Sequence, residues 1–174
     1  KFDIIYAGAQ KNMGPAGTTL VVVKEEILGK NGREIPSILD YAKHIKAESM
    51  YNTPAVFPVY ASLLTLQWLK NLGGIAAVEK LNNAKANLLY TEIDRNPLFK
   101  GAAAVEDRSA MNATFLLNNP EHATVFDAMW KEAGISGLPG HRSVGGYRAS
   151  MYNAMPIESV QVLVDVMQAL EKAV

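Results

Sequence analysis

A single lysine, Lys11, stands in a glycine-rich stretch (residues 7–17) between two short apolar runs. The runs, residues 4–6 and 18–23, are rich in β-branched side chains and bounded by glycine, so we predict two buried strands joined by a tight turn. An amine on such a turn has little access to bulk water, which lowers its pKa, and a neutral amine can attack an aldehyde to form a Schiff base. A surface hairpin whose lysine keeps the turn soluble is the alternative, and the composition of the loop alone favours it.

The second group of candidate residues is cationic. His141, Arg142 and Arg148 lie within eight residues, with Gly145 and Gly146 between them and no acidic side chain beside them in the sequence. Glycines let a backbone approach a ligand closely, and the arginine fork matches the geometry of both carboxylate and phosphate groups. The pattern therefore favours an anion-binding loop, and a solvated basic loop is the alternative.

Uncharged hydrogen-bond donors occur at two further places. Gln10 carries an amide beside Lys11, while Asn52 and Thr53 offer an amide and a hydroxyl ahead of an apolar segment. Such groups suit phosphate oxygens. Each also has an ordinary structural role, because an amide can satisfy a backbone group at a strand end and Thr or Asn before a helix is a typical cap. The residues alone leave both choices open.

The helices that would hold these groups follow from the spacing of apolar side chains. Residues 55–72 predict a long, largely buried helix, and residues 75–93 predict a second helix that is amphipathic. The second helix has an expected inner face of Val78, Leu81, Leu88 and Leu89, and an expected outer face of Glu79, Lys80, Asn82 and Lys85. Ahead of both helices, residues 38–49 predict an extended segment.

The Asn96-Pro97 dipeptide is the best candidate for a domain boundary. Beyond it the predicted elements are paired strands at 102–105 and 111–117, a helix at 120–133, a strand at 144–150 and a helix at 156–174. Strands covered by helices on one side indicate an α+β layer. Trp68 and Trp130 fall on apolar helical faces, so we expect both in the core.

Composition excludes several classes of function. The chain has 174 residues with 17 Lys plus Arg and 17 Asp plus Glu, so no net field attracts nucleic acid or an anionic membrane. We find no signal peptide and no apolar run long enough to span a bilayer. Zero cysteines exclude disulfides and thiolate metal sites, and three histidines without helical pairing argue against a zinc centre. These features favour a cytoplasmic protein.

Five segments, taken in order, resemble the phosphoserine aminotransferase family, whose members are pyridoxal-phosphate enzymes of fold type I. They are AGAQKN followed by GPAG (7–17), SMYNTP (49–54), DRSAMN (107–112), GHRSVGGYRAS (140–150) and YNAMP (152–156). The resemblance runs from the first residues to the last helix.

The resemblance implies roles for the residues near the cofactor. Lys11 would form the Schiff base with pyridoxal 5'-phosphate and later move a proton between the substrate's α-carbon and the cofactor. Gln10 would bind the cofactor phosphate. Asn52 and Thr53 would reach across a homodimer interface to the cofactor phosphate of the partner subunit, so that dimerisation would be a condition of cofactor binding.

The resemblance also implies how substrate is bound. His141 and Arg142 would hold the substrate's phosphate, and Arg148 its α-carboxylate. The implied reaction converts 3-phosphohydroxypyruvate and glutamate to phosphoserine and 2-oxoglutarate in serine biosynthesis, and bacterial members often serve pyridoxine biosynthesis too. Arg108 also matches the family, but its position beside a strand pair favours a structural role.

In architecture, the resemblance implies an α/β fold that is the C-terminal part of a fold type I transferase. Residues 1–96 would be the tail of the large α/β/α cofactor domain, and residues 97–174 a small α+β domain. Members of the family are longer, and the part expected before Lys1 would complete the cofactor site, so we expect little turnover from the isolated chain. The alternatives are an inactive folded fragment, an anion-binding module, or another fold type I aminotransferase, such as one acting on alanine and glyoxylate.

Overall fold

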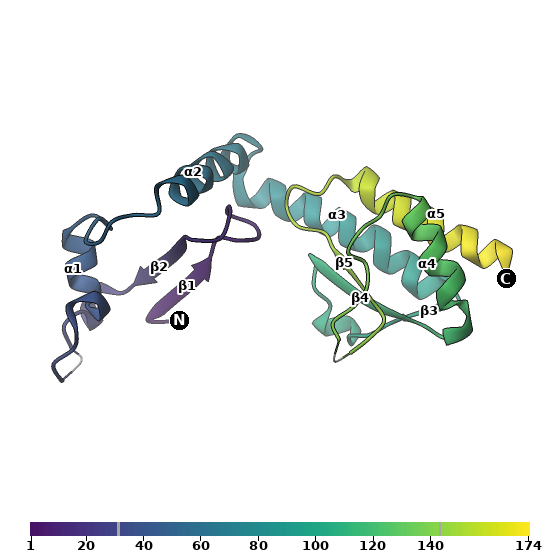
Figure 1. The fold of residues 1–174 in the computed structure, drawn as a ribbon, viewed down its shortest axis with the longest axis horizontal. Coiled ribbons are helices and arrows are strands. Elements are labelled where there is room, and N and C mark those ends of the chain that lie inside the picture. Colours follow the sequence, from purple (N-terminus) through teal and green to yellow (C-terminus); the bar gives the residue numbers. More distant parts are fainter. Residues whose placement is uncertain (31, 143) are drawn as a thin grey trace. The chain divides into compact units, whose positions relative to one another are not determined.

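The structure is a computed structural model that describes residues 1–30, 32–142 and 144–174, and it has a mixed α/β fold (Figure 1). The chain forms two compact units, residues 1–71 and residues 72–174. Within the described residues, no helix combines the length and apolar character that a bilayer crossing requires. The division into domains at Asn96-Pro97 stays a prediction about the family's domains.

The first unit is built on a β-hairpin followed by helices. Strands β1 (Ile4–Gly8) and β2 (Thr19–Val23) pair antiparallel, with Ile4 opposite Val23 and Gly8 opposite Thr19. The two predicted strands are therefore confirmed, but the prediction that they are buried is wrong for this unit, because no residue of either strand is buried. A two-stranded hairpin is too small to cover its own faces, so both strands stay largely exposed within this unit.

Residues 38–46 are largely helical and residues 47–49 form a turn, so the predicted extended segment is wrong. A 3₁₀ turn (Ser37–Leu39) is followed by α1 (Tyr41–Lys46). The reason is a local cap: the Asp40 carboxylate accepts a hydrogen bond from the Ala42 backbone N–H at 3.0 Å. Three basic side chains in the last turn also interact favourably with the negative end of the helix dipole.

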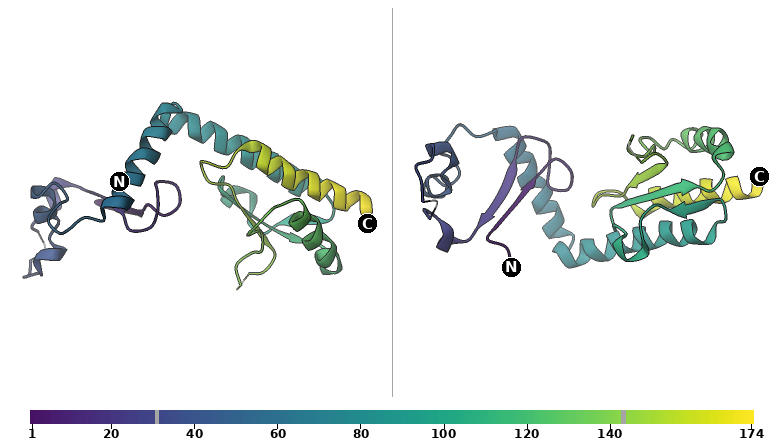
Figure 2. Two further views of the ribbon diagram at one scale, coloured as in Figure 1. Left: turned by 45° about the horizontal axis from the view of Figure 1, so that its top comes forward. Right: turned by 90° about the horizontal axis from the view of Figure 1, so that it is seen from below.

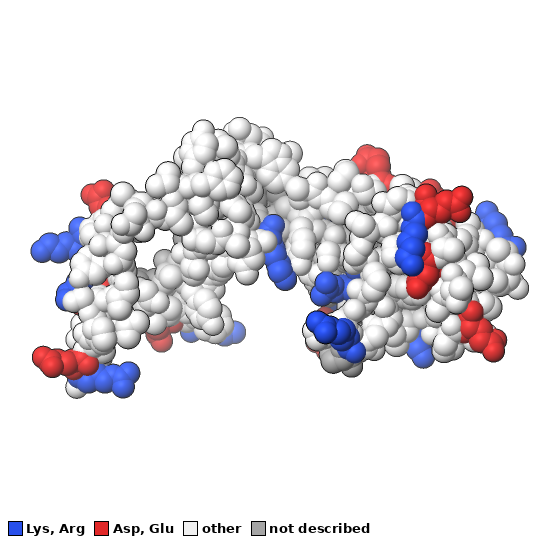
Figure 3. Space-filling model, in the orientation of Figure 1, with Lys and Arg blue, Asp and Glu red and all other residues white. Residues whose placement is uncertain are grey.

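Helix α2 (Val56–Asn71) begins and ends within one residue of the predicted bounds. Its predicted burial is wrong within this unit, because Ser62 is its only buried residue and Phe57 is 73% exposed. Trp68, which we expected in the core, is 40% exposed. The face of α2 seen in Figure 3 carries no charged side chain, which is consistent with a helix whose single charged residue is Lys70.

The second unit joins an antiparallel sheet to three helices. Its elements are α3 (Gly74–Arg95), β3 (Phe99–Gly101), β4 (Asn112–Leu117), α4 (Ala123–Glu132), β5 (Tyr147–Ser150) and α5 (Ile157–Ala173). The strand order is β3-β4-β5, and both pairs are antiparallel. Helix α3 packs on β3 and β4, α5 lies beside α3, and α4 packs on α5 (Figure 2). The predicted α+β layer is confirmed.

Two predicted strands lie at different residues. The partner of β4 is Phe99–Gly101 and not 102–105, and Phe99 pairs with Leu117. Phe99 decides this register, because its ring packs 5.8 Å from that of Phe115 and 5.2 Å from that of Phe126 in the core. The predicted strand at 144–150 is shortened to β5, since Gly145 and Gly146 both have positive φ. Residue 143 lies outside the described part.

The core of this unit lies between the sheet and the helices. Its fully buried side chains include Leu89, Phe115, Phe126, Met167 and Leu170, and Trp130 is buried as predicted. On α3 the predicted faces need correction: Leu81 is 49% exposed, whereas Asn82 and Lys85 are 7% and 2% exposed. Both polar side chains hold the segment after β5, as described below.

Candidate active site

The turn that carries Lys11 is held by one backbone carbonyl. Ala9 O accepts hydrogen bonds from the backbone N–H of Lys11 at 2.6 Å, Met13 at 3.1 Å and Gly14 at 2.9 Å. Ala9 N donates to Thr18 O at 2.9 Å across the hairpin, and Ala9 is only 1% exposed. The path of the turn is thus determined by main-chain atoms.

The same turn lies directly against α2. A Cβ added to Gly14 would lie 2.5 Å from Ser62 Oγ, and one added to Gly17 would lie 3.0 Å from Pro58 Cγ. Glycine is required at these positions because a larger residue would push the turn away from the helix. Contact with α2 therefore gives Lys11 a defined position.

The Lys11 side chain is exposed within this unit. The desolvation that we predicted for its amine is not provided by the residues of the unit itself. The ordered turn still fixes where the Lys11 side chain begins, and a neutral amine at this place could attack an aldehyde.

Uncharged donors lie on the same unit. Gln10 folds back over the hairpin, since a Cβ at Gly8 would clash with Gln10 Oε1. Asn52 and Thr53 are exposed and lie between α1 and α2. Helix α2 begins at Val56, and the carbonyl directly before it, that of Ala55, accepts from Val59 N at 3.1 Å. Neither Asn52 nor Thr53 occupies the capping position, which weakens the alternative that they serve as a helix cap.

The cationic loop belongs to the second unit and is closed at its base by backbone bonds. Arg148 N donates to Leu138 O at 2.7 Å, and Gly140 N donates to Gly146 O at 2.8 Å. At the tip, His141 O accepts from two backbone N–H groups, those of Val144 and Gly145. Backbone hydrogen bonds thus hold the described residues on both sides of position 143.

Gly146 is the residue on which the loop turns into β5. Its φ is +63°, and an added Cβ would lie 2.6 Å from Phe115 O on the neighbouring strand. Gly145 also has a positive φ of +74°, but a Cβ there would meet nothing within 4 Å. Glycine is therefore needed at Gly146 both for its conformation and for the close approach of β4.

The alternation of β5 places Arg148 outward. Tyr147 and Ala149 are buried, whereas Arg148 is exposed, as are His141 and Arg142 on the loop. Within the described ranges, no acidic side chain forms an ion pair with Arg142 or Arg148. These two guanidinium groups are therefore available to an external anion.

Tyr147 anchors the strand that presents Arg148. Its hydroxyl donates to Asp127 Oδ1 at 2.9 Å, the same oxygen accepts from Trp130 Nε1 at 2.9 Å, and its ring stacks on Phe115 at 5.4 Å. Burial, with the neighbouring carboxylate, raises the pKa of the Tyr147 phenol. Sequence reasoning missed this anchor, because Tyr147 and Asp127 are 20 residues apart and no local pattern indicates that they meet.

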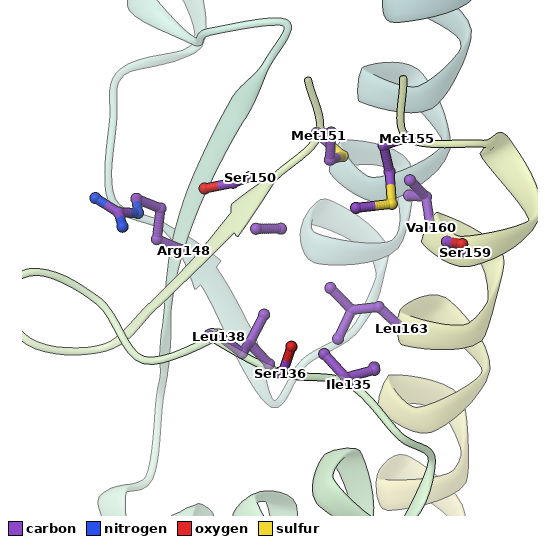
Figure 4. Close-up of a pocket in the computed structure, with 12 residues that line it drawn as sticks. Ile135, Ser136, Leu138, Arg148, Ser150, Met151, Met155, Ser159, Val160 and Leu163 are labelled. Atoms are coloured by element: carbon purple, nitrogen blue, oxygen red, sulfur yellow. The ribbon is translucent and has the colours of Figure 1, made fainter. Parts of the chain in front are cut away.

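A small cavity lies beside Arg148, between β5, the 135–138 segment and α5 (Figure 4). Its volume is about 110 Å³, and its lining includes Met151, Met155 and Leu163. The carbon chain of Arg148 is at the rim, and the guanidinium points away from these apolar side chains. The charged group of Arg148 therefore lies outside the cavity.

Arg108 has the structural role that its position predicted. Its two terminal nitrogens donate to the two oxygens of Asp94, both at 2.7 Å, and its guanidinium lies 4.6 Å from the ring centre of Tyr90. The described residues contain no cluster of three or more His, Cys, Asp or Glu that could hold a metal ion. On the face seen in Figure 3, positive and negative side chains are intermixed over the second unit.

The predicted residues thus form two groups. Gln10, Lys11, Asn52 and Thr53 belong to the first unit, and His141, Arg142 and Arg148 belong to one loop and strand of the second unit. The first group offers an amine and uncharged donors, which suit an aldehyde that carries a phosphate. The second group offers cations, which suit a substrate with carboxylate or phosphate groups.

This sequence and fold place the chain in the aminotransferase class-V family, whose model matches residues 1–163. Among its relatives, the phosphoserine aminotransferase of Flavobacterium johnsoniae is 87% identical over 174 residues, which are 100% of this chain and 49% of that protein. The chain therefore spans about half the length of the curated relatives that it matches.

Solved structures agree with this assignment. A phosphoserine aminotransferase studied for radiation damage of its Schiff base has a TM-score of 0.91 at 46% identity, over 99% of this chain and 48% of that one. The PLP-bound phosphoserine aminotransferase from Trichomonas vaginalis has a TM-score of 0.84 at 36% identity, over 95% of this chain and 48% of that one.

Proposed function

We propose that this chain is part of a phosphoserine aminotransferase, which uses pyridoxal 5'-phosphate to convert 3-phosphohydroxypyruvate and glutamate to phosphoserine and 2-oxoglutarate. The observation that carries the proposal is the identity of 87% over the whole chain to a protein of that name. The proposal places the reaction in serine biosynthesis, with a further use in pyridoxine biosynthesis, and the protein in the cytoplasm. Residues 1–96 would belong to the large domain and residues 97–174 to the small one.

Residues of the first unit would hold the cofactor. When bound, pyridoxal 5'-phosphate supplies an aldehyde for covalent attachment and a ring that accepts electrons. Lys11 is the group of this chain that can bond to the aldehyde, because its amine is exposed on a turn of fixed path. Once released, the same amine can carry a proton to and from the α-carbon of the substrate.

The cofactor phosphate would be bound by uncharged donors. Gln10 lies beside Lys11, and its amide can donate to a phosphate oxygen. Asn52 and Thr53 are exposed and do not cap α2, so both side chains are available for the phosphate of a partner subunit's cofactor. A homodimer with a shared site is thus part of the proposal.

Residues of the second unit would bind substrate. His141 and Arg142 suit the phosphate of phosphoserine, and Arg148 suits its α-carboxylate. Glutamate carries two carboxylates and could use the same cations. Hydrogen bonds of this charged type contribute about 1.5–3 kcal/mol each, so two of them would dominate recognition of a doubly anionic amino acid.

The test uses the full-length protein that contains this chain. Purified protein should transfer the amino group from glutamate to 3-phosphohydroxypyruvate, and borohydride should fix the cofactor to Lys11, as mapped by mass spectrometry. Activity with alanine and glyoxylate but none with phosphoserine would instead identify a different aminotransferase. Borohydride labelling at another lysine would refute the role of Lys11.

A further inference from the structure

Lys85 is a buried cation that none of the roles above uses. It lies on α3, is 2% exposed, and is among the largest fully buried side chains of the protein. Burial lowers the pKa of its amine. A buried lysine is costly unless its ammonium group is hydrogen-bonded, so its partners are informative.

The Lys85 amine holds the chain where it leaves β5. Nζ donates to Met151 O at 3.1 Å and to Tyr152 O at 2.8 Å. Two consecutive carbonyls just beyond the end of the strand therefore share one buried donor. Asn82, one turn earlier on α3, donates from Nδ2 to Asn153 Oδ1 at 2.9 Å. Three successive residues are thus fixed to one face of the helix.

This segment is connected directly to Arg148. Met151 N donates to Met111 O at 2.8 Å, which continues the ladder that pairs Ser150 with Asn112. Arg148 lies on β5, three residues before Met151, which directly follows the end of the strand. As Figure 4 shows, the chain runs from Arg148 past Ser150 to Met151, and Met151 also lines the cavity beside Arg148.

We propose that Lys85 is a positioning residue for Arg148. By donating to the Met151 and Tyr152 carbonyls, it fixes the exit of β5 on α3 and so sets where the strand holds the guanidinium. The inference rests on the proposed function only for the identity of the ligand, the α-carboxylate of the amino acid substrate. Without Lys85, the Met151 carbonyl loses its buried donor and the Tyr152 carbonyl keeps the backbone N–H of Met155, so the link between this segment and α3 is lost.

The first test is kinetic and uses the full-length enzyme. Lys85→Met keeps the length and removes the donor, and Lys80→Met is the matched control, because Lys80 is exposed on the same helix. We expect K85M to raise KM for both glutamate and phosphoserine about tenfold, less than the ~100-fold that a 1 Å misplacement can cause. The kcat per bound cofactor should change little. A purely structural defect would lower the active fraction and leave KM unchanged, which would overturn the proposal.

A double-mutant cycle then tests whether Lys85 acts through Arg148. In an Arg148→Ala background, K85M should cause little further rise in KM, since the group that it positions is gone. An equal rise in both backgrounds would overturn the proposal. If K85M does not fold, Asn82→Ala removes one contact to the same segment and should raise KM about threefold, the effect expected for loss of one hydrogen bond. An unchanged KM in N82A would then count against the inference.

A last measurement separates this inference from the proposed function. Hydrogen exchange of the 147–153 segment in the 174-residue chain needs no substrate or activity. K85M should accelerate exchange there, and K80M should not. If the wild-type enzyme transfers amino groups but K85M and K80M exchange alike, the inference fails and the function stands. If the wild type is inactive but K85M alone accelerates exchange, the function fails and the anchoring role of Lys85 stands.

Discussion

Substitution of Gly146 by alanine should destabilise the second unit more than the same change at Gly145. Both residues have left-handed backbones, with φ of +63° and +74°. Alanine at either position pays the cost of that conformation, about 1–2 kcal/mol. Only at Gly146 would the new Cβ also meet backbone, because it would lie 2.6 Å from Phe115 O.

The magnitude follows from this difference. Overpacking a tight contact costs about 1–3 kcal/mol. We therefore expect G145A to lower the free energy of unfolding by about 1–2 kcal/mol, and G146A to lower it by that amount plus the overpacking cost. The carbonyl of β4 cannot move away cheaply, since Phe115 is 0% exposed and pairs with Tyr147 across the strands.

Urea unfolding of the 174-residue chain provides the assay. Trp130, 4% exposed, reports on the second unit, and a Trp68→Phe background removes the tryptophan of the first unit. The midpoint should fall in the order wild type, G145A, G146A at unchanged m-value. Equal losses in the two variants would refute the reasoning, because the close approach of β4 to Gly146 would then have no energetic effect.

Three further predictions concern the core, acid stability and substrate binding. Phe126→Ala should lower the unfolding free energy of the second unit by about 3–5 kcal/mol, measured by the same urea assay, because three aromatic rings pack on the buried Phe126 ring. Burial acts to raise the pKa of Glu92, but hydrogen bonds from Arg95, Asn96 and Gln168 outweigh it and lower the pKa below its ordinary 4.5. The contribution of Glu92 to stability is therefore fully present above pH 4.5 and lost as the pH falls through the folded-state pKa, so Glu92→Gln should flatten the acid limb of a stability–pH curve. Arg148→Lys in the full-length enzyme should raise KM for glutamate by about tenfold, since a lysine cannot replace a bidentate fork, and an unchanged KM would contradict the assigned role.

The long helices were predictable from sequence because their apolar spacing and glycine stops are local signals. Residues 55–72 and 75–93 predicted α2 and α3 to within two residues. The helix α1 was missed because its signal is a single cap by Asp40 and not a periodic pattern. The position of β3 was missed because it depends on Phe99 meeting Phe126, which lies 27 residues further along the chain.

The candidate site was predictable to a different degree. The spacing of Arg142 and Arg148 favoured an anion-binding loop, whereas the residues around Lys11 alone favoured a surface hairpin, and the role of Lys11 came from the family resemblance. The structure adds backbone hydrogen bonds that hold the turn of Lys11 and the base of the cationic loop. Lys85 was assigned to the outer face of its helix, since a charged residue in a helical pattern normally faces water. Its acceptors lie 66 and 67 residues away in the chain, so no local pattern could reveal them.

In the turn that carries Lys11, three backbone N–H groups donate to the carbonyl of Ala9, so the hydrogen bonds that hold the turn are independent of the side chain that would react. These three hydrogen bonds use backbone atoms only, so a substitution at Lys11 removes the amine without removing any of their donors or their acceptor. A different reactive side chain placed at position 11 would therefore start from the same backbone position, which makes this hairpin a suitable place to engineer a new covalent attachment site.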